Sequence, residues 1–157
     1  MILTKDQKGV LKKLMTVSAK KGNLANAGMV IDNNIMIASA ESWVVSSTDA
    51  TAHSERMLVE IVGKLKHSNY TPGLTMVSVV EPCIMCMSAC SQAGYKEIYY
   101  IIPAKKYIDK IPWMSDTKVD KQMIASQFSE PIKLSHLKEY EKEFCVVFGQ
   151  VMAHLLK

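Results

Sequence analysis

Apolar residues recur every three or four positions in three stretches of this chain, which is the spacing of one face of an α-helix. The three predicted helices cover residues 4–20, 53–66 and 136–156. Thr4 and Gln7 have the spacing of a capping box, which supports a helix start at that point. The apolar positions of the last helix predict either a core face or a dimer surface: Leu137, Tyr140, Phe144, Val147, Phe148 and Val151.

Short continuous apolar runs between these stretches predict β-strands. Two of them flank the turn-forming Asp32-Asn33-Asn34 and predict a hairpin. The predicted strands are 27–31, 35–38, 74–80, 96–102 and 132–134, with shorter helices at 82–93 and 119–127 and loops at 40–52 and 103–117. Gly28 is expected to let the backbone approach a ligand pocket. Alternating helices and strands predict an α/β domain with a mixed sheet.

The length of 157 residues and the 48% hydrophobic content predict one domain, residues 1–157, with a substantial core. No apolar run reaches the ~18 residues of a membrane span. The first residues lack a basic segment followed by an apolar one, so we expect no signal peptide and a cytoplasmic location. Thiols stay reduced there, and Cys90 and Cys145 are expected to be buried apolar side chains.

The formal net charge of +4 is compatible with nucleic-acid contact but does not require it. Arg56 is the only arginine among the 19 basic residues. RNA recognition commonly uses arginine for stacking and for bidentate phosphate contacts. The composition therefore weighs modestly against an RNA substrate.

Cys83 and Cys86 directly follow Pro82, which suits the first position of a helix. Cysteines three apart on a helix share a face and can bind one metal ion. Zinc takes thiolate and imidazole ligands in a tetrahedron, and a catalytic site leaves the fourth position to water. We expect His53, at the start of the second predicted helix, to be the third ligand. The other histidines are not part of such a motif, and we interpret them as structural or exposed: His67, His136 and His154.

Glu55, two residues after His53, is then a free carboxylate beside the metal-bound water and a candidate general acid/base. The pattern His-x-Glu followed by Pro-Cys-x-x-Cys is the signature of zinc deaminases acting on nucleobases. Residues 48–55 and 81–86 resemble the cytidine-deaminase-like superfamily. Within it they are most similar to the branch of guanine deaminases, cytosine deaminases and tRNA adenosine deaminases.

The resemblance implies a three-layer α/β/α sandwich with a five-stranded mixed sheet, a Zn²⁺ cofactor and a homodimer. It also implies substrate contacts. Relatives usually carry a substrate-binding asparagine where this chain has Ser42, and Ala52 precedes the ligand histidine. Trp113 and Asp116 loosely resemble the aromatic residue and the acid with which guanine deaminases recognise a purine.

Three functions follow from these observations. The first is deamination of a free base or nucleoside, with guanine favoured over cytosine or cytidine. The second is deamination of adenosine in tRNA, whose motif flanks fit equally well. The third is a non-catalytic zinc domain that serves as a partner subunit, which has no use for a carboxylate such as Glu55 outside the metal ligands.

Overall fold

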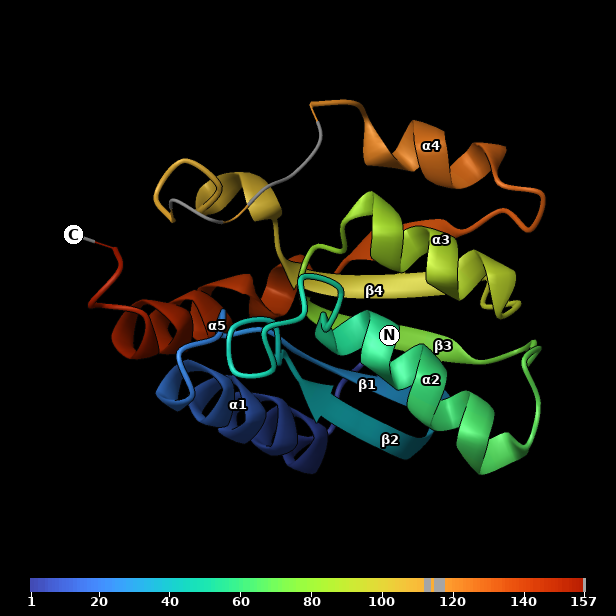
Figure 1. The fold of residues 1–157 in the computed structure, drawn as a ribbon, viewed down its shortest axis with the longest axis horizontal. Helices are drawn as coiled ribbons and strands as arrows, with labels where there is room; N and C mark the ends of the chain where they lie inside the picture. The colour runs from blue at the N-terminus through green and yellow to red at the C-terminus, as the bar shows by residue number, and fades with distance from the viewer. Residues whose placement is uncertain (112–113, 115–117, 157) are drawn as a thin grey trace.

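A five-stranded sheet separates two layers of helices in the computed structural model, which describes residues 1–111, 114 and 118–156 (Figure 1). The strands lie in the order β2-β1-β3-β4-β5. Their bounds are β1 Ala27–Asp32, β2 Ile35–Glu41, β3 Thr75–Val80, β4 Glu97–Ile102 and β5 Lys133–His136. The helices are α1 Lys5–Lys20, α2 Ser54–Lys66, α3 Ile84–Gln92, α4 Lys121–Gln127 and α5 Lys138–Val151, with a short 3₁₀ helix, η1, at Ala104–Lys106. The predicted α/β fold with a five-stranded mixed sheet is confirmed.

Helices α1 and α5 cover one face of the sheet (Figure 1). Thr4 and Gln7 form the predicted capping box at the start of α1. The apolar stripe of α5 faces inward, because Phe144 and Phe148 are fully buried in a core shared with Leu11 and Met15. Of the two readings left open for this stripe, core and dimer surface, the structure supports core.

Helices α2, α3 and α4 cover the opposite face, where α2 packs against both β1 and β2. Gly28 explains how α2 comes so close. A Cβ atom on Gly28 would lie 3.0 Å from Cδ1 of Leu58 and from the carbonyl oxygen of Val77. We expected Gly28 to let the backbone approach a ligand pocket, and this expectation was wrong. The missing side chain of Gly28 instead lets α2 approach the sheet.

Strands β3, β4 and β5 run parallel, whereas β1 pairs antiparallel with both β2 and β3. The parallel strands therefore end at one edge of the sheet, where α3 begins directly after β3. Such edges are where open α/β sheets bind ligands. The residues singled out around Cys83 lie at this edge.

Several predicted boundaries were wrong by a few residues. Ala40 and Glu41 belong to β2 rather than to a loop, because they continue the ladder opposite Gly28 and Ala27. His136 ends β5, where it pairs with Tyr100, so the last helix begins only at Lys138. That helix ends at Val151 rather than at residue 156.

All four cysteines are free thiols, as expected of a reduced chain. Cys90 is fully buried, which confirms its predicted role, while Cys145 is half-buried against the core. In the part of the chain that the structure describes, no helix has both the length and the hydropathy to cross a bilayer.

Candidate active site

Three sulfur- and nitrogen-bearing side chains meet where two helices begin. His53 is the N-cap of α2 and Cys83 is the N-cap of α3, both with extended backbone. Cys86 lies in the first turn of α3 and is fully buried. Pro82 is therefore not the first helical residue as predicted. It precedes the N-cap, and because a proline disfavours helical backbone at the residue before it, Glu81 leaves β3 in an extended conformation.

The three ligand atoms form an equilateral triangle. The Cys83 and Cys86 sulfurs are 3.6 Å apart, and each lies 3.6 Å from Nδ1 of His53. A tetrahedral zinc ion with ordinary bond lengths places two sulfurs about 3.8 Å apart and a sulfur and a nitrogen about 3.6 Å apart. The donor set and its spacing thus fit zinc with a fourth position left over, and the spacing excludes a disulfide.

The electrostatics of this cluster favour a cation. In the metal-free protein, hydrogen bonding to Cys86 and to His53 lowers the pKa of the Cys83 thiol to about 4. Hydrogen bonding to Cys83 raises the pKa of His53. The same pairing, followed by burial, raises the pKa of Cys86. Cys83 is therefore the more acidic of the two thiols, and a divalent ion can replace the protons that the cluster holds.

Glu55 lies beside the cluster on the first turn of α2 and is 2% exposed. Its Oε1 accepts hydrogen bonds from Nδ2 of Asn26 at 3.2 Å and from the Ser78 hydroxyl at 2.7 Å. Its Oε2 accepts one from the Ser54 hydroxyl and lies 3.7 Å from the Cys86 sulfur. Among the described residues, the potential metal ligands are His53, Cys83 and Cys86, and Glu55 is not one of them. The carboxylate is thus close to the metal position without being a ligand.

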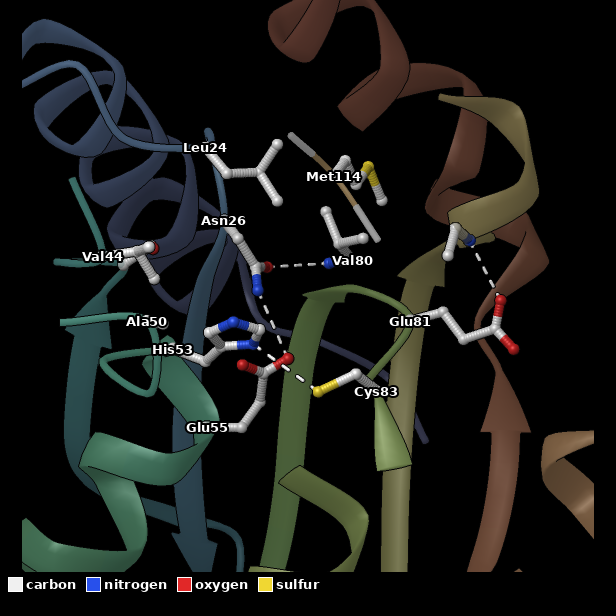
Figure 2. A pocket seen from close by; sticks show the side chains of 12 residues that line it. Leu24, Asn26, Val44, Ala50, His53, Glu55, Val80, Glu81, Cys83 and Met114 are labelled. Atoms are coloured by element: carbon white, nitrogen blue, oxygen red, sulfur yellow. Dashed lines mark hydrogen bonds between the residues drawn. The ribbon is translucent and has the colours of Figure 1, made fainter. Parts of the chain in front are cut away.

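A cavity of about 200 Å³ opens onto these side chains, with His53, Glu55 and Cys83 in its wall (Figure 2). The other lining residues are Leu24, Asn26, Ser42, Val44, Ala50, Val80, Glu81, Ala104 and Met114. Within the described part of the chain, this lining contains two carboxylates and neither a lysine nor an arginine.

Residues 5–102, more than half of the chain, match the model of the cytidine and deoxycytidylate deaminase zinc-binding region. The protein belongs to this family. Zinc is its cofactor, and the His53, Cys83 and Cys86 cluster is complete, with a buried glutamate beside it.

Two curated relatives each match a little more than half of the chain. A tRNA-specific adenosine deaminase from Aquifex aeolicus is 24% identical over 88 residues, which are 56% of this chain and 58% of the relative. A guanine deaminase from Bacillus subtilis is 26% identical over 94 residues, 57% of this chain and 60% of the relative. The chain thus matches less than two thirds of the length of either relative.

Solved structures share the fold over more of the chain. A guanine deaminase from Nitrosomonas europaea superposes with a TM-score of 0.80 at 16% identity, covering 98% of this chain and 87% of that one. Other structural neighbours are complexes with 8-azaguanine and with 2,6-diaminopurine, at TM-scores of 0.78 and 0.80. These two structural neighbours bind purine bases.

The residues predicted to contact the substrate differ in where they lie relative to the cavity. Ser42 is buried and lines the cavity. Ala52 is buried and its carbonyl accepts the Trp43 backbone N–H, but it is not among the described residues that line the cavity, where Ala50 is found instead. Trp113 and Asp116 lie outside the described residues.

Asn26 is a site residue that sequence reasoning missed. It lies directly before β1, is 6% exposed and contributes its carboxamide to the cavity wall (Figure 2). A signal was present in the sequence, because Asn26 is a polar residue directly before the apolar run of residues 27–31. A polar side chain at an otherwise apolar strand start marks a buried hydrogen-bonding role.

Glu81 secures the other side of the cavity. Its Oε2 accepts the backbone N–H of Ala104 at 3.0 Å (Figure 2). Its Oε1 lies 3.7 Å from Nζ of Lys121. The residue that precedes Pro82 thereby ties the start of α3 to the segments that follow β4. This contact holds the cavity wall at Ala104 in place.

Proposed function

We propose that the protein is a zinc-dependent hydrolytic deaminase of a free nucleobase or nucleoside, with guanine favoured over cytosine and cytidine. The observation that carries the proposal is the buried Glu55 carboxylate, whose Oε2 lies beside the three-ligand cluster at the wall of a cavity. A purely structural zinc site does not need such a group. Water is consumed, a ring C–NH₂ becomes C=O, and ammonia leaves.

A zinc ion held by His53, Cys83 and Cys86 would supply a water whose pKa is lowered toward ~7, and so a nucleophile near neutral pH. Glu55 then accepts a proton at Oε2 and returns it to the leaving amino group. Its Oε1 is engaged by Asn26 and Ser78, which leaves Oε2 on the side of the cluster. The cavity walls hold the ring and exclude bulk water from it.

The preference for a free base is supported by the lining and by the single arginine. The described lining of the cavity has no lysine or arginine that would pair with a phosphate. Arg56 is engaged by the carboxylates of Glu60 and Asp49, so its guanidinium is not free for stacking on a base. The guanine deaminase from Bacillus subtilis among the relatives supports guanine as the first choice.

Deamination of adenosine in tRNA is the second candidate. It is favoured by the similarity to the Aquifex aeolicus enzyme and by the net charge of +4. A flipped base in RNA needs contacts to neighbouring phosphates, and such binding weakens steeply with salt. A non-catalytic zinc-binding partner subunit is the third candidate, and the buried carboxylate of Glu55 weighs against it.

A panel of ammonia-release assays tests the choice. The zinc-loaded protein is incubated at low salt with guanine, cytosine, cytidine, adenine and an anticodon stem-loop that contains adenosine. We expect release from guanine. Turnover of the stem-loop alone would establish the tRNA function instead, turnover of cytosine alone would remove the purine assignment, and no release from any of them would favour the partner subunit.

Glu55→Gln keeps the size and the hydrogen-bonding capacity of the side chain but cannot transfer protons. We expect zinc to stay bound while turnover falls ~10²-fold or more, the scale of acid/base catalysis. Glu60→Gln, at an exposed position of the same helix, is the matched control and should keep wild-type turnover. Near-wild-type activity in Glu55→Gln would place the proton transfer elsewhere.

Ser42, Ala52, Trp113 and Asp116 stay predicted substrate contacts of this site. Because Asp116 is proposed to accept N–H groups of a purine and Trp113 to stack on it, we expect Trp113→Ala and Asp116→Ala to abolish turnover of guanine. Zinc content, measured by elemental analysis, should not change in either variant. Wild-type guanine turnover in both variants would remove these two residues from the site.

A further inference from the structure

Asn26 joins three elements that build the site. It lies directly before β1, its carbonyl accepts the backbone N–H of Ser42, and its side chain reaches both the end of β3 and the first turn of α2. Figure 2 shows the carboxamide between Val80 and Glu55. A contact that links strand ends to a helix start can hold a side chain of that helix in one orientation.

The orientation of the carboxamide is determined by the backbone. Its Oδ1 accepts the N–H of Val80 at 2.9 Å and the N–H of Ala27 at 3.0 Å. Two donors at this end require the oxygen there, so Nδ2 must be at the other end, 3.2 Å from Oε1 of Glu55. The N–H of Nδ2 is thus aimed at the carboxylate.

The other donors to Glu55 are hydroxyl groups, which can rotate. The Ser78 hydroxyl lies 2.7 Å from Oε1 of Glu55 and equally 2.7 Å from the carbonyl oxygen of Val80, and it has one hydrogen for the two acceptors. The Ser54 hydroxyl sits on the residue next to Glu55 and moves with α2. Neither hydroxyl therefore holds the Glu55 carboxylate in a fixed position relative to the sheet. The Asn26 carboxamide can do so, because it is hydrogen-bonded at both ends.

We infer that Asn26 is a positioning residue that fixes the orientation of the Glu55 carboxylate, with Oε1 turned to the sheet and Oε2 to the metal ligands. Val80 ends β3, two residues before Pro82, so the same carboxamide relates Glu55 to the strand that leads to Cys83 and Cys86. The expected effect on turnover rests on the proposed deaminase function. The contact itself does not depend on that function.

Asn26→Asp tests the inference with little change in shape. The new carboxylate still accepts from Val80 and Ala27, but its second oxygen faces the Glu55 carboxylate where a donor stood. Asn23→Asp is the matched control. Asn23 is also buried, and its Oδ1 also accepts two backbone N–H groups, from Val45 and Ser46. Its Nδ2 donates to the Ser46 hydroxyl, which can turn and donate to an aspartate instead.

The first measurement is thermal unfolding of the zinc-loaded variants, which needs no substrate. Each Asn→Asp change is made both in the wild type and in the Glu55→Gln variant. In Glu55→Gln, the new amide can donate a hydrogen bond to an aspartate at position 26, while the Ser78 hydroxyl donates to the carbonyl oxygen of Val80. We expect Asn26→Asp to lower Tm by about 3–8 °C in the wild type and by less than half of that in Glu55→Gln. Asn23→Asp should give the same shift in both backgrounds.

An equal shift for Asn26→Asp in both backgrounds overturns the inference, because additivity means that the two side chains do not interact. If Asn26→Asp alone does not fold, recovery of folded protein in the double variant supports the contact. If neither folds while Asn23→Asp does, the role of Asn26 is structural and the inference fails.

The second measurement is steady-state kinetics on the base that the wild type hydrolyses. Loss of orientation at Glu55 should lower kcat ~10-fold to 10²-fold in Asn26→Asp with KM within about twofold. Asn23→Asp should keep both values. A raised KM at unchanged kcat would make Asn26 a substrate contact instead, and unchanged kcat and KM would also overturn the inference. If the wild type hydrolyses none of the bases, the proposed function fails, and the Tm comparison by itself decides the role of Asn26.

Discussion

His53 and Cys83 occupy the same local position at the starts of two different helices. N-cap positions usually carry Ser, Thr, Asp or Asn, whose oxygens cap the helix and contribute about 0.5–2 kcal/mol. Neither His53 nor Cys83 makes a side-chain cap hydrogen bond to its own helix, and the structure describes every residue of both helices. Both side chains instead face each other across 3.6 Å. The missing caps are offset when the two residues share a zinc ion, so metal binding and folding of this edge are coupled.

We therefore predict one zinc ion per chain, bound by His53, Cys83 and Cys86. Elemental analysis of protein prepared without chelator should find it, and the double variant Cys83→Ala/Cys86→Ala should contain almost none. Removal of zinc by a chelator should also lower Tm, because the ion binds only the folded cluster. Cys145→Ala, at a half-buried cysteine of α5, should keep its zinc. Full zinc retention in the double variant would rule out this site.

At the scale of elements, α1 and α5 are joined at the surface of their layer. Glu143 of α5 forms ion pairs with Lys8 and Lys12 of α1. Hydrogen bonding to Lys12 and then to Lys8 lowers the pKa of Glu143 below its usual range. Because the folded-state pKa is the lower one, the pairs stabilise the protein above the ordinary carboxyl pKa. That contribution is lost as the pH falls through the folded-state pKa.

Glu143→Gln should accordingly lower Tm by a few degrees at most at pH 7. The side chain is 38% exposed, so solvent screening limits the contribution to less than ~1 kcal/mol. The difference from the wild type should disappear as the pH falls through the lowered pKa of Glu143, because the carboxyl group then becomes protonated. Glu139→Gln, at an exposed position of the same helix, should show no pH-dependent difference. A difference for Glu143→Gln that persists at low pH would show that it does not come from charge.

A second prediction concerns the contact between α2 and the sheet. Gly28→Ala should destabilise the protein by about 1–3 kcal/mol, because the new methyl group would overlap Leu58 and the Val77 carbonyl unless α2 moves outward. Since α2 carries His53 and Glu55, we also expect weaker zinc binding.

Gly9→Ala is the matched control, because a Cβ there meets no described atom within 4 Å. It should stabilise α1 by about 0.5–1 kcal/mol. Unfolding in urea measures both variants, and equal stability of Gly28→Ala and the wild type would contradict the close contact.

At the scale of the whole molecule, the surface left for assembly differs from the one first considered. The stripe of α5 is in the core, so it does not support a dimer. The opposite layer exposes apolar side chains that include Ile61 and Leu65 of α2 and Ile84 of α3, whereas α5 exposes Val146. The homodimer stays a prediction, and this layer is where we expect the interface.

Sedimentation at micromolar concentration should give twice the chain mass of 17.5 kDa. Leu65→Glu should shift the protein toward the monomer, because a charge would be buried at the predicted interface. Val146→Glu changes an equally exposed apolar position of α5, on the other layer, and should leave the dimer intact. A wild-type monomer would contradict the prediction, and dissociation by Val146→Glu alone would move the interface to α5.

The sequence by itself determined the elements, the fold class and the chemistry of the metal cluster. Helices such as α1 follow from local patterns, the capping box of Thr4 and a stripe of period 3.6, and local patterns do not depend on distant contacts. The ligands could be found because zinc demands particular side chains at short spacings. Cys83 and Cys86 are three apart, and a histidine followed two residues later by a glutamate is a rare partner for them. That the chain forms one domain is a further prediction of this kind, based on its length.

Only the tertiary structure decided the distances and contacts that depend on how the helices pack on the sheet. The 3.6 Å triangle joins residues thirty positions apart, and no local pattern sets that distance. Asn26 meets Glu55 because α2 packs on β1, an approach that Gly28 permits. The stripe of α5 reads equally as core or interface in sequence, since both bury the same apolar groups. What it packs against is a property of the assembled layers, and the assembled protein places Phe144 and Phe148 in the core.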